Sequence, residues 1–175
     1  LVGPGLGRGA LARERLATAL ADPVAAVVDA DALLLLAPRQ MAGRAAPTVA
    51  TPHEGELTAL ERAFDCDGGG SKVDRAAVLA KASGLIVVAK GPDTVVAAPD
   101  GRIACAPRAT SWLSVAGTGD VLAGIIASRL AAGEDAFDAA CAGVWLHGEA
   151  ARRTHAPFTA GALAEAVPAA LAACL

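Results

Sequence analysis

The chain has 175 residues, a formal net charge of −3 and 54% hydrophobic residues, few of which are aromatic. This length suits a single domain with a hydrophobic core, which we assign to residues 1–175. The near-balanced charge and the lack of a basic run argue against a nucleic-acid partner. We also expect no membrane partner, because no charge-free apolar stretch reaches the roughly 18 residues of a membrane span and no signal-peptide pattern is present.

The four cysteines show no spacing typical of a metal site. Cys66, Cys105, Cys141 and Cys174 lie far apart, and no C-x-x-C pair occurs. This argues against a zinc site and against a disulfide framework. We therefore expect free thiols in the reducing environment of the cytoplasm.

Helices and strands are predicted to alternate along the chain. Apolar patterns and turn residues predict, in order, a helix over 10–21, a strand over 24–28, a short helix over 32–36, a strand over 48–50, helices around 57–64 and 73–83, a strand over 85–89, a hairpin of strands 95–98 and 102–105, and helices from 120, over 135–153 and over 159–173. This alternation predicts an α/β fold with a mostly parallel, doubly wound sheet that is flanked by helices.

Several loops between these elements carry glycines, carboxylates or both, namely 3–9, 29–33, 51–57 and 90–94. In open α/β sheets ligands gather at the carboxyl ends of the strands, so we expect these loops to meet at one edge. Each loop also has a simpler interpretation. Asp31 could cap the helix at 32–36, His53 could be structural, and Lys90 could be a solvated lysine instead of a phosphate ligand.

The stretch AGTGDVLAG at 116–124 predicts a tight turn that leads into a helix. Its glycines let successive backbone N–H groups point into one concavity, and the helix dipole adds partial positive charge, so we expect an anion site. Asp120 is unfavourable beside a phosphate unless it does chemistry, such as acting as a base on a hydroxyl that attacks the phosphate. The alternative is that Asp120 is an ordinary residue of a helix N-terminus.

Together these motifs resemble those of the carbohydrate-kinase-like NAD(P)H-hydrate dehydratases, which have a ribokinase-type fold. The matching segments are 3–7 (GPGLG), 29–33 (DADAL), 51–56 (TPHEGE), 90–94 (KGPDT), 116–124 (AGTGDVLAG) and 144–148 (VWLHG). Any one segment would be a weak signal, but the ordered set covers nearly the whole chain. The resemblance implies a ribokinase-like domain that dehydrates NADHX or NADPHX, the hydrated forms of NADH and NADPH. It also implies that ADP or ATP is consumed with Mg²⁺.

The resemblance implies roles for individual residues as well. Asp120 would be the catalytic base on the hydroxyl of the hydrate, and the amides of Gly117, Thr118 and Gly119 would form the anion hole. The hydrate would be bound by Gly3, Gly5, His53 and Asp120. The adenine nucleotide would be bound by Lys90, Gly91, Pro92, Asp93, Thr94 and Gly119. Glu56 would act on the metal indirectly, with His53 where related kinases carry an asparagine.

The chain departs from the family pattern at several points. The usual KGAGT is KGPDT, so that Pro92 lacks an N–H and Asp93 adds negative charge beside the expected phosphate site. The usual GGTGD begins with Ala116, and the usual His-Pro is His53-Glu54. Family members also carry an N-terminal section before the GPGLG loop. We therefore expect a truncated domain with an unpaired sheet edge and an exposed apolar face.

Two other functions stay open. One is a small-molecule kinase of the same fold that acts on a vitamin alcohol, although the Thr-Pro-His of residues 51–53 favours the dehydratase. The other is a non-catalytic remnant that binds nucleotide, although the retained Asp120 argues against it. The exposed sheet surface leads us to expect a homo-oligomer, and the domain could be fused to or paired with an NAD(P)H-hydrate epimerase domain, as in many members of the family.

Overall fold

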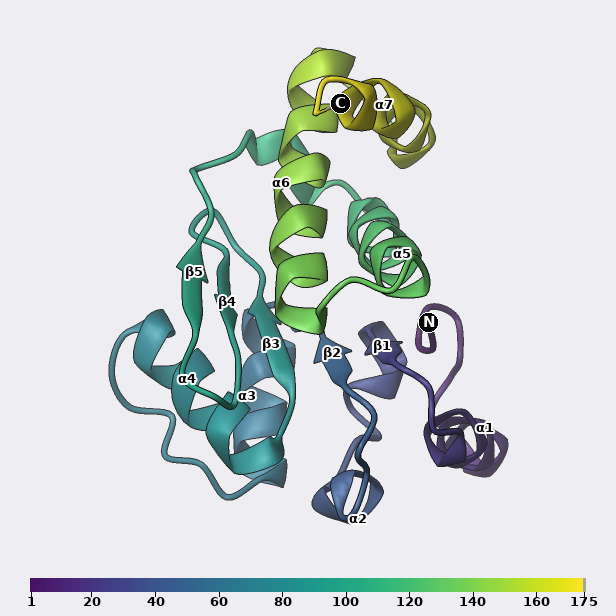
Figure 1. Ribbon diagram of the computed structural model, residues 1–175, viewed down its shortest axis with the longest axis vertical. Helices are drawn as coiled ribbons and strands as arrows, with labels where there is room; N and C mark the ends of the chain where they lie inside the picture. Colours follow the sequence, from purple (N-terminus) through teal and green to yellow (C-terminus); the bar gives the residue numbers. More distant parts are fainter. Residues whose placement is uncertain (175) are drawn as a thin grey trace.

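The computed structural model describes residues 1–174, which form one mixed sheet of five short strands (Figure 1). In spatial order the strands are β1 (Ala26–Val28), β2 (Thr48–Ala50), β3 (Ile86–Ala89), β4 (Val95–Ala97) and β5 (Ile103–Cys105). β1, β2 and β3 are parallel, and β4 runs antiparallel to both of its neighbours. Because the spatial order follows the chain without reversal, the prediction of a doubly wound sheet was wrong for these residues.

Helices nevertheless cover both faces of the sheet. They are α1 (Ala10–Ala21), α2 (Pro38–Met41), α3 (Glu54–Ala63), α4 (Lys72–Ser83), α5 (Thr118–Ala131), α6 (Ala136–Thr154) and α7 (Ala160–Ala172), with short 3₁₀ helices η1 (Ala30–Ala32) and η2 (Ser111–Ser114). Figure 1 shows α1, α3 and α4 on one side of the sheet and α5 and α6 on the other, with α7 packed on α6. The second face is thus covered by the C-terminal helices and not by crossover connections.

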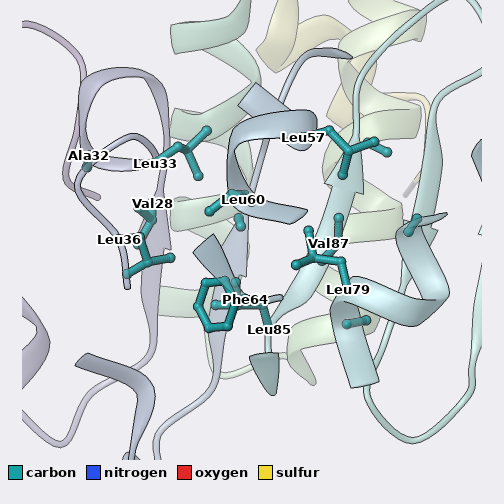
Figure 2. Close-up of a cluster of buried hydrophobic side chains, with 14 of the residues drawn as sticks. Val28, Ala32, Leu33, Leu36, Leu57, Leu60, Phe64, Leu79, Leu85 and Val87 are labelled. Atoms are coloured by element: carbon teal, nitrogen blue, oxygen red, sulfur yellow. The ribbon is translucent and has the colours of Figure 1, made fainter. Parts of the chain in front are cut away.

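Alternate residues of the parallel strands contribute to two separate cores. Val28 and Val87 belong to the core that α1, α3 and α4 cover, part of which is drawn in Figure 2. Val27, Val49 and Val88 belong to the core under α5 and α6. Since both faces of these strands are buried, their residues are alanine, valine and isoleucine, except for Thr48 at the start of β2. Polar side chains can therefore gather only where the strands end.

The segment between β1 and β2 differs from the prediction of a helix over 32–36. The structure has the 3₁₀ helix η1 (Ala30–Ala32), a series of turns and then α2. Leu33, Leu35 and Leu36 are all buried in the first core, so their packing determines the backbone more than helical periodicity does. Pro38 also disfavours a helical residue directly before it.

The partly buried guanidinium of Arg75 connects α3 to α4. Arg75 of α4 donates from Nε and Nη2 to the two carboxylate oxygens of Glu61, at 2.7 and 2.8 Å, and also pairs with Glu54. Glu61 is buried, and a paired, bidentate geometry is what stabilises such a carboxylate. These interactions hold α3 against α4, and the N-terminus of α3 carries His53 and Glu56.

The outer edge of β1 is apolar and exposed, as the sequence predicts. On that side Val28 has only an isolated bridge to Val2 among the described residues. The side chains of Leu1 and Val24 beside it are 57% and 59% exposed. A cavity of about 310 Å³ lies here and is lined by Leu1, Val24, Ala25, Val27, Ala127, Leu130 and Ala131.

The four cysteines are free thiols. Cys66 and Cys141 are partly buried, and burial raises the pKa of both thiols, which favours the less reactive protonated form. Among the helices formed by residues 1–174, none combines the length and the apolar character that crossing a membrane requires.

Candidate active site

The turn before α5 is held in shape by Thr118. Gly117 adopts a φ of +87°, a left-handed conformation that glycine accepts without strain. The hydroxyl of Thr118 lies 2.6 and 2.8 Å from the carbonyl oxygens of Leu113 and Val115. The backbone N–H of Thr118 also donates to the carbonyl of Val115, at 3.2 Å. Thr118 therefore fixes the turn, and its amide is already occupied.

The amides of Gly119 and Asp120 follow in the first turn of α5. First-turn N–H groups have no acceptor within their own helix, and in residues 1–174 no other acceptor meets these two. The side chain of Asp120 is exposed in the same turn. The anion site expected from Gly117, Thr118 and Gly119 is thus best served by the amides of Gly119 and Asp120, with a carboxylate beside them.

Lys90 brings a cation to the same turn. Its Nζ lies 2.9 Å from Oδ1 of Asp29 and 3.9 Å from Oε2 of Glu56. A Cβ added at Gly119 would lie 3.4 Å from this Nζ, so the ammonium group borders the start of α5. A cation is unfavourable at the positive end of a helix dipole, and the two carboxylates offset this cost. An anion at the start of α5 would meet both the amides and the ammonium.

Asp29 belongs to this site, although the sequence analysis placed it only within the loop 29–33 and gave it no role of its own. Its side chain is buried and accepts hydrogen bonds from Oγ1 of Thr51 at 2.7 Å and from Nζ of Lys90 at 2.9 Å. A carboxylate buried this deeply is stable only when it is paired. Asp29, Thr51 and Lys90 directly follow β1, β2 and β3, so their common position after buried strands was the signal in the sequence.

His53 and Glu56 form the N-terminal cap of α3. Nδ1 of His53 accepts from the N–H of Glu56 at 3.2 Å, and Oε2 of Glu56 accepts from the N–H of His53 at 2.8 Å. Glu56 is buried, whereas the imidazole of His53 is largely exposed. His53 therefore has the structural role of a cap, and its exposed ring also faces solvent beside the site.

The loop Lys90–Thr94 is tied down at three points. The N–H of Lys90 donates to the carbonyl of Pro52 at 2.8 Å. The hydroxyl of Thr94 donates to the carbonyl of Gly91 at 2.8 Å. The carboxylate of Asp93 pairs with Lys72 at the start of α4, and this hydrogen bond lowers the pKa of Asp93. Lys72 could not be predicted to offset the negative charge of Asp93, because the two residues lie 21 positions apart in the sequence.

The loop 3–9 folds back onto the segment after β1. Gly3 has a φ of +142° and passes so close to Asp29 that an added Cβ would collide with its carbonyl. Asp31 accepts from the N–H of Gly7 at 3.0 Å and from Nε of Arg8 at 2.9 Å, and the Arg8 bond holds the pKa of Asp31 low. Asp31 therefore closes this loop and does not cap a helix. Gly5, which also has a positive φ, is exposed.

His147 of α6 contacts the backbone at the start of α5. Its Nε2 lies 2.8 Å from the carbonyl oxygen of Thr118, and the residue is 8% exposed. Burial, together with the smaller effect of the charge of Lys90, lowers the pKa of His147 to about 4. The imidazole is therefore neutral at pH 7, and since a carbonyl only accepts, Nε2 carries the hydrogen. The segment VWLHG was matched in the sequence without a role for this histidine.

A protein-family model described as NAD(P)H-hydrate dehydratase, in the Carb_kinase family, matches residues 1–172. The chain belongs to this family. The resemblance seen in the motifs is thereby confirmed, and so is the ribokinase-like α/β fold, with its mostly parallel sheet between helices.

Named relatives lie close to this chain. The ADP-dependent (S)-NAD(P)H-hydrate dehydratase of Neisseria meningitidis is 41% identical over 184 residues, which cover 97% of this chain and 60% of that protein. The bifunctional NAD(P)H-hydrate repair enzyme Nnr of Mycobacterium leprae is 41% identical over 153 residues, which cover 86% of this chain and 32% of that protein.

A solved structure is similar along almost the whole chain. The ADP/ATP-dependent NAD(P)H-hydrate dehydratase of Bacillus subtilis, co-crystallised with ATP and Mg²⁺, has a TM-score of 0.83 at 28% identity and covers 98% of this chain. This chain covers 63% of that structure. The chain thus spans between about one third and two thirds of the length of these three relatives.

Proposed function

We propose that this chain carries the nucleotide-dependent dehydration of NADHX or NADPHX, which restores NADH or NADPH. The observation that carries the proposal is the convergence at the start of α5. There the amides of Gly119 and Asp120, the carboxylate of Asp120 and the ammonium group of Lys90 lie together. This set offers an anion site with a base beside it, which is what phosphoryl transfer to a hydroxyl group requires.

The proposed reaction proceeds in two steps. The carboxylate of Asp120 takes the proton of the hydrate's hydroxyl group, and the oxygen bonds to the terminal phosphorus of the nucleotide as the phosphorus–oxygen bond to the leaving nucleotide breaks. The carbon–oxygen bond of the new phosphate ester then breaks, and inorganic phosphate leaves with its electron pair. Loss of a proton from the neighbouring ring carbon forms the double bond of the dihydronicotinamide.

The remaining residues of the site have binding roles in this proposal. The loop of Lys90, Gly91, Pro92, Asp93 and Thr94 would hold the adenine nucleotide together with Gly119. Gly3, Gly5 and His53 would contact the hydrate beside Asp120. The position of Gly3 supports this role, since its backbone lies directly against Asp29.

Mg²⁺ would enter with the nucleotide. Within residues 1–174 no three His, Cys, Asp or Glu side chains gather as a metal cage. Both carboxylate oxygens of Glu56 face His53, at 2.8 Å from its N–H nitrogen and 3.4 Å from Nε2, so Glu56 could reach a metal only through water. Mg²⁺ commonly keeps several waters and binds substrate phosphates with few protein ligands, and these residues fit such an ion. When bound, Mg²⁺ would offset charge on the transferred phosphate.

The chain covers less than two thirds of the relatives' length, so we place it as part of a larger repair enzyme. The Mycobacterium leprae relative is a bifunctional NAD(P)H-hydrate repair enzyme, which supports fusion to or pairing with an epimerase domain. The exposed apolar edge beside β1 supports contact with further protein, such as a second copy in a homo-oligomer.

The direct test is dehydration of purified NADHX and NADPHX with Mg²⁺ and either ADP or ATP. Absorbance of the restored dihydronicotinamide reports the reaction. We expect nucleotide-dependent turnover, and we expect Asp120→Asn to lower kcat by at least about 100-fold, the usual contribution of a general base. Accumulation of a phosphorylated alcohol without dehydration would instead indicate a kinase.

A matched control is available in the first turn of α6. Asp138→Asn removes an exposed carboxylate from a second helix N-terminus, so it repeats the charge change and the dipole effect away from the site. We expect Asp138→Asn to keep wild-type kcat. Nucleotide binding by calorimetry without any turnover would contradict the catalytic proposal and indicate a binding remnant.

A further inference from the structure

We propose that Lys72 determines the nucleotide affinity of this site by neutralising Asp93 in the loop Lys90–Thr94. This inference rests on the proposed function, because it concerns the nucleotide loop of the same site. Lys72 acts through another residue, so we regard it as a positioning residue. It would set how strongly the loop discriminates between nucleotides with one, two and three phosphates.

The position of Lys72 is unfavourable by itself. It is the first residue of α4, where the helix dipole presents partial positive charge and disfavours a cation. Its side chain is only 16% exposed, so the ammonium group is not simply solvated. A compensating interaction is therefore needed, and the carboxylate of Asp93 supplies it.

Lys72 is also packed against the loop backbone. A Cβ added at Gly91 would collide with Nζ of Lys72, so the ammonium group occupies the space that a side chain at position 91 would take. Gly91 directly follows Lys90, whose ammonium group borders the start of α5. Lys72 thus places a second positive charge next to the proposed phosphate site, at the point where the loop carries its only carboxylate.

Without Lys72, the charge of Asp93 would act on a bound phosphate. Asp93 lies three positions after Lys90, and a chain of that length spans at most about 10 Å. This is comparable to the screening length at 0.1 M salt, also about 10 Å, so an unpaired carboxylate here would repel phosphate across the loop. The repulsion grows with the charge of the nucleotide, which makes it larger for ATP than for ADP and larger for ADP than for AMP.

The test is calorimetric titration of AMP, ADP and ATP into the wild type, Lys72→Met, Asp93→Asn and the double variant at low salt with Mg²⁺. We expect Lys72→Met to weaken ADP binding by about fivefold, with a larger loss for ATP and a smaller one for AMP. Asp93→Asn should bind ADP more tightly than the wild type, because it removes the carboxylate that repels phosphate and leaves the charge of Lys72 uncompensated beside the loop. The double variant should return to within about twofold of the wild type, because removing the carboxylate removes the need for the cation.

Lys81→Met is the matched control, since Lys81 is an exposed lysine in the last turn of the same helix. It should leave the affinity for all three nucleotides unchanged. Unaltered ADP binding by Lys72→Met would overturn the inference. A double variant that stays as weak as Lys72→Met would also overturn it, since Lys72 would then act by contact or by holding the loop. If the wild type neither binds nucleotide nor dehydrates NADHX, that result contradicts the proposed function itself, and the inference about Lys72 falls with it.

Discussion

A cationic side chain lies at each end of the parallel strands, Arg44 at the amino ends and Lys90 at the carboxyl ends. Uncharged acceptors bind the first, and carboxylates pair with the second. At the amino ends of the strands, the guanidinium of Arg44 reaches the carbonyl oxygens of Leu20, Asp22 and Val24, which precede β1. Its Nε donates to the hydroxyl of Thr48 at 2.8 Å. All of these acceptors are uncharged groups of the protein itself.

At the carboxyl ends, Lys90 pairs with the carboxylates of Asp29 and Glu56 and borders the start of α5. A carboxylate can share its cation with a second anion, whereas backbone carbonyls at a chain turn cannot give up theirs without opening the fold. Arg44 therefore has the geometry of a structural clamp, whereas Lys90 lies in the proposed binding site.

Lys90→Met should have the largest effect on stability. It leaves Asp29 buried with a single hydroxyl donor, and breaking such a pair costs about 3–5 kcal/mol. Urea unfolding measures the loss. Adding Asp29→Asn should recover most of it, because no buried charge is then left unpaired.

The double variant also separates the two roles of Lys90. If the ammonium group is part of the nucleotide site, the refolded double variant should still bind ADP at least tenfold more weakly than the wild type. Wild-type ADP affinity in this variant would mean that Lys90 has the same purely structural role as Arg44.

Stability should also fall at acid pH through His147. Its pKa is about 4 in the fold and near 6.5 when unfolded, so between these values the unfolded chain binds more protons than the folded chain. The contribution of neutral His147 is complete above about pH 6.5 and is lost as the pH falls to 4. The loss is about 3 kcal/mol, and it is measured as the unfolding free energy from pH 7 to pH 4.

His147→Gln separates this effect from the titration of surface carboxylates. The variant should be less stable than the wild type at pH 7, and the difference should shrink as the pH falls toward 4. Parallel pH profiles for the two proteins would show that His147 is not the group that titrates.

Much of the fold could be predicted because single segments carried the signal. The strands β1 and β3 are apolar on both faces, and β2 is apolar after Thr48. The hairpin turn and the glycine after α4 mark their elements locally. The order of the strands in the sheet and the turns at 33–36 could not be predicted, because both depend on packing between segments that are distant in the sequence. Leu33, Leu35 and Leu36 pack on several sides at once, and no helical period describes that arrangement.

The candidate site also has parts that the sequence predicts locally and parts that it does not. The turn at Gly117 and the start of a helix with Gly119 and Asp120 could be predicted, because these features are adjacent in the sequence. The pairing of Asp29 with Lys90 joins residues 61 positions apart, and only the sheet brings them together. The hydrogen bond that occupies the amide of Thr118 depends on the exact path of the turn after η2, which residue types alone do not determine.

Arg44→Met should destabilise the fold without affecting the site. The change removes the donors that serve three carbonyl oxygens and one hydroxyl, and we expect a loss of about 2 kcal/mol in the unfolding free energy. ADP affinity, measured by calorimetry well below the unfolding temperature, should stay within about twofold of the wild type. A tenfold loss of ADP affinity would contradict this prediction and show that Arg44 also affects nucleotide binding.

Gly119→Ala should have the smallest effect on stability and still impair the site. Gly119 lies in the first turn of α5 and has no positive φ, so alanine fits there and should stabilise the helix by about 0.5 kcal/mol. The new methyl group would lie 3.4 Å from Nζ of Lys90, in the space between the ammonium group and the helix amides. A phosphate needs that space, so we expect ADP affinity to fall about tenfold while the protein becomes slightly more stable.

Gly124→Ala provides the control for this last change. Gly124 lies one and a half turns further along α5, and an added Cβ there would meet no atom within 4 Å. It should stabilise the helix by a similar amount, about 0.5–1 kcal/mol, and leave ADP affinity unchanged. Equal ADP affinity in the two alanine variants would place the phosphate away from Gly119. A loss confined to Gly119→Ala would place the phosphate between Lys90 and the start of α5, because the two changes differ only in which space the methyl group fills.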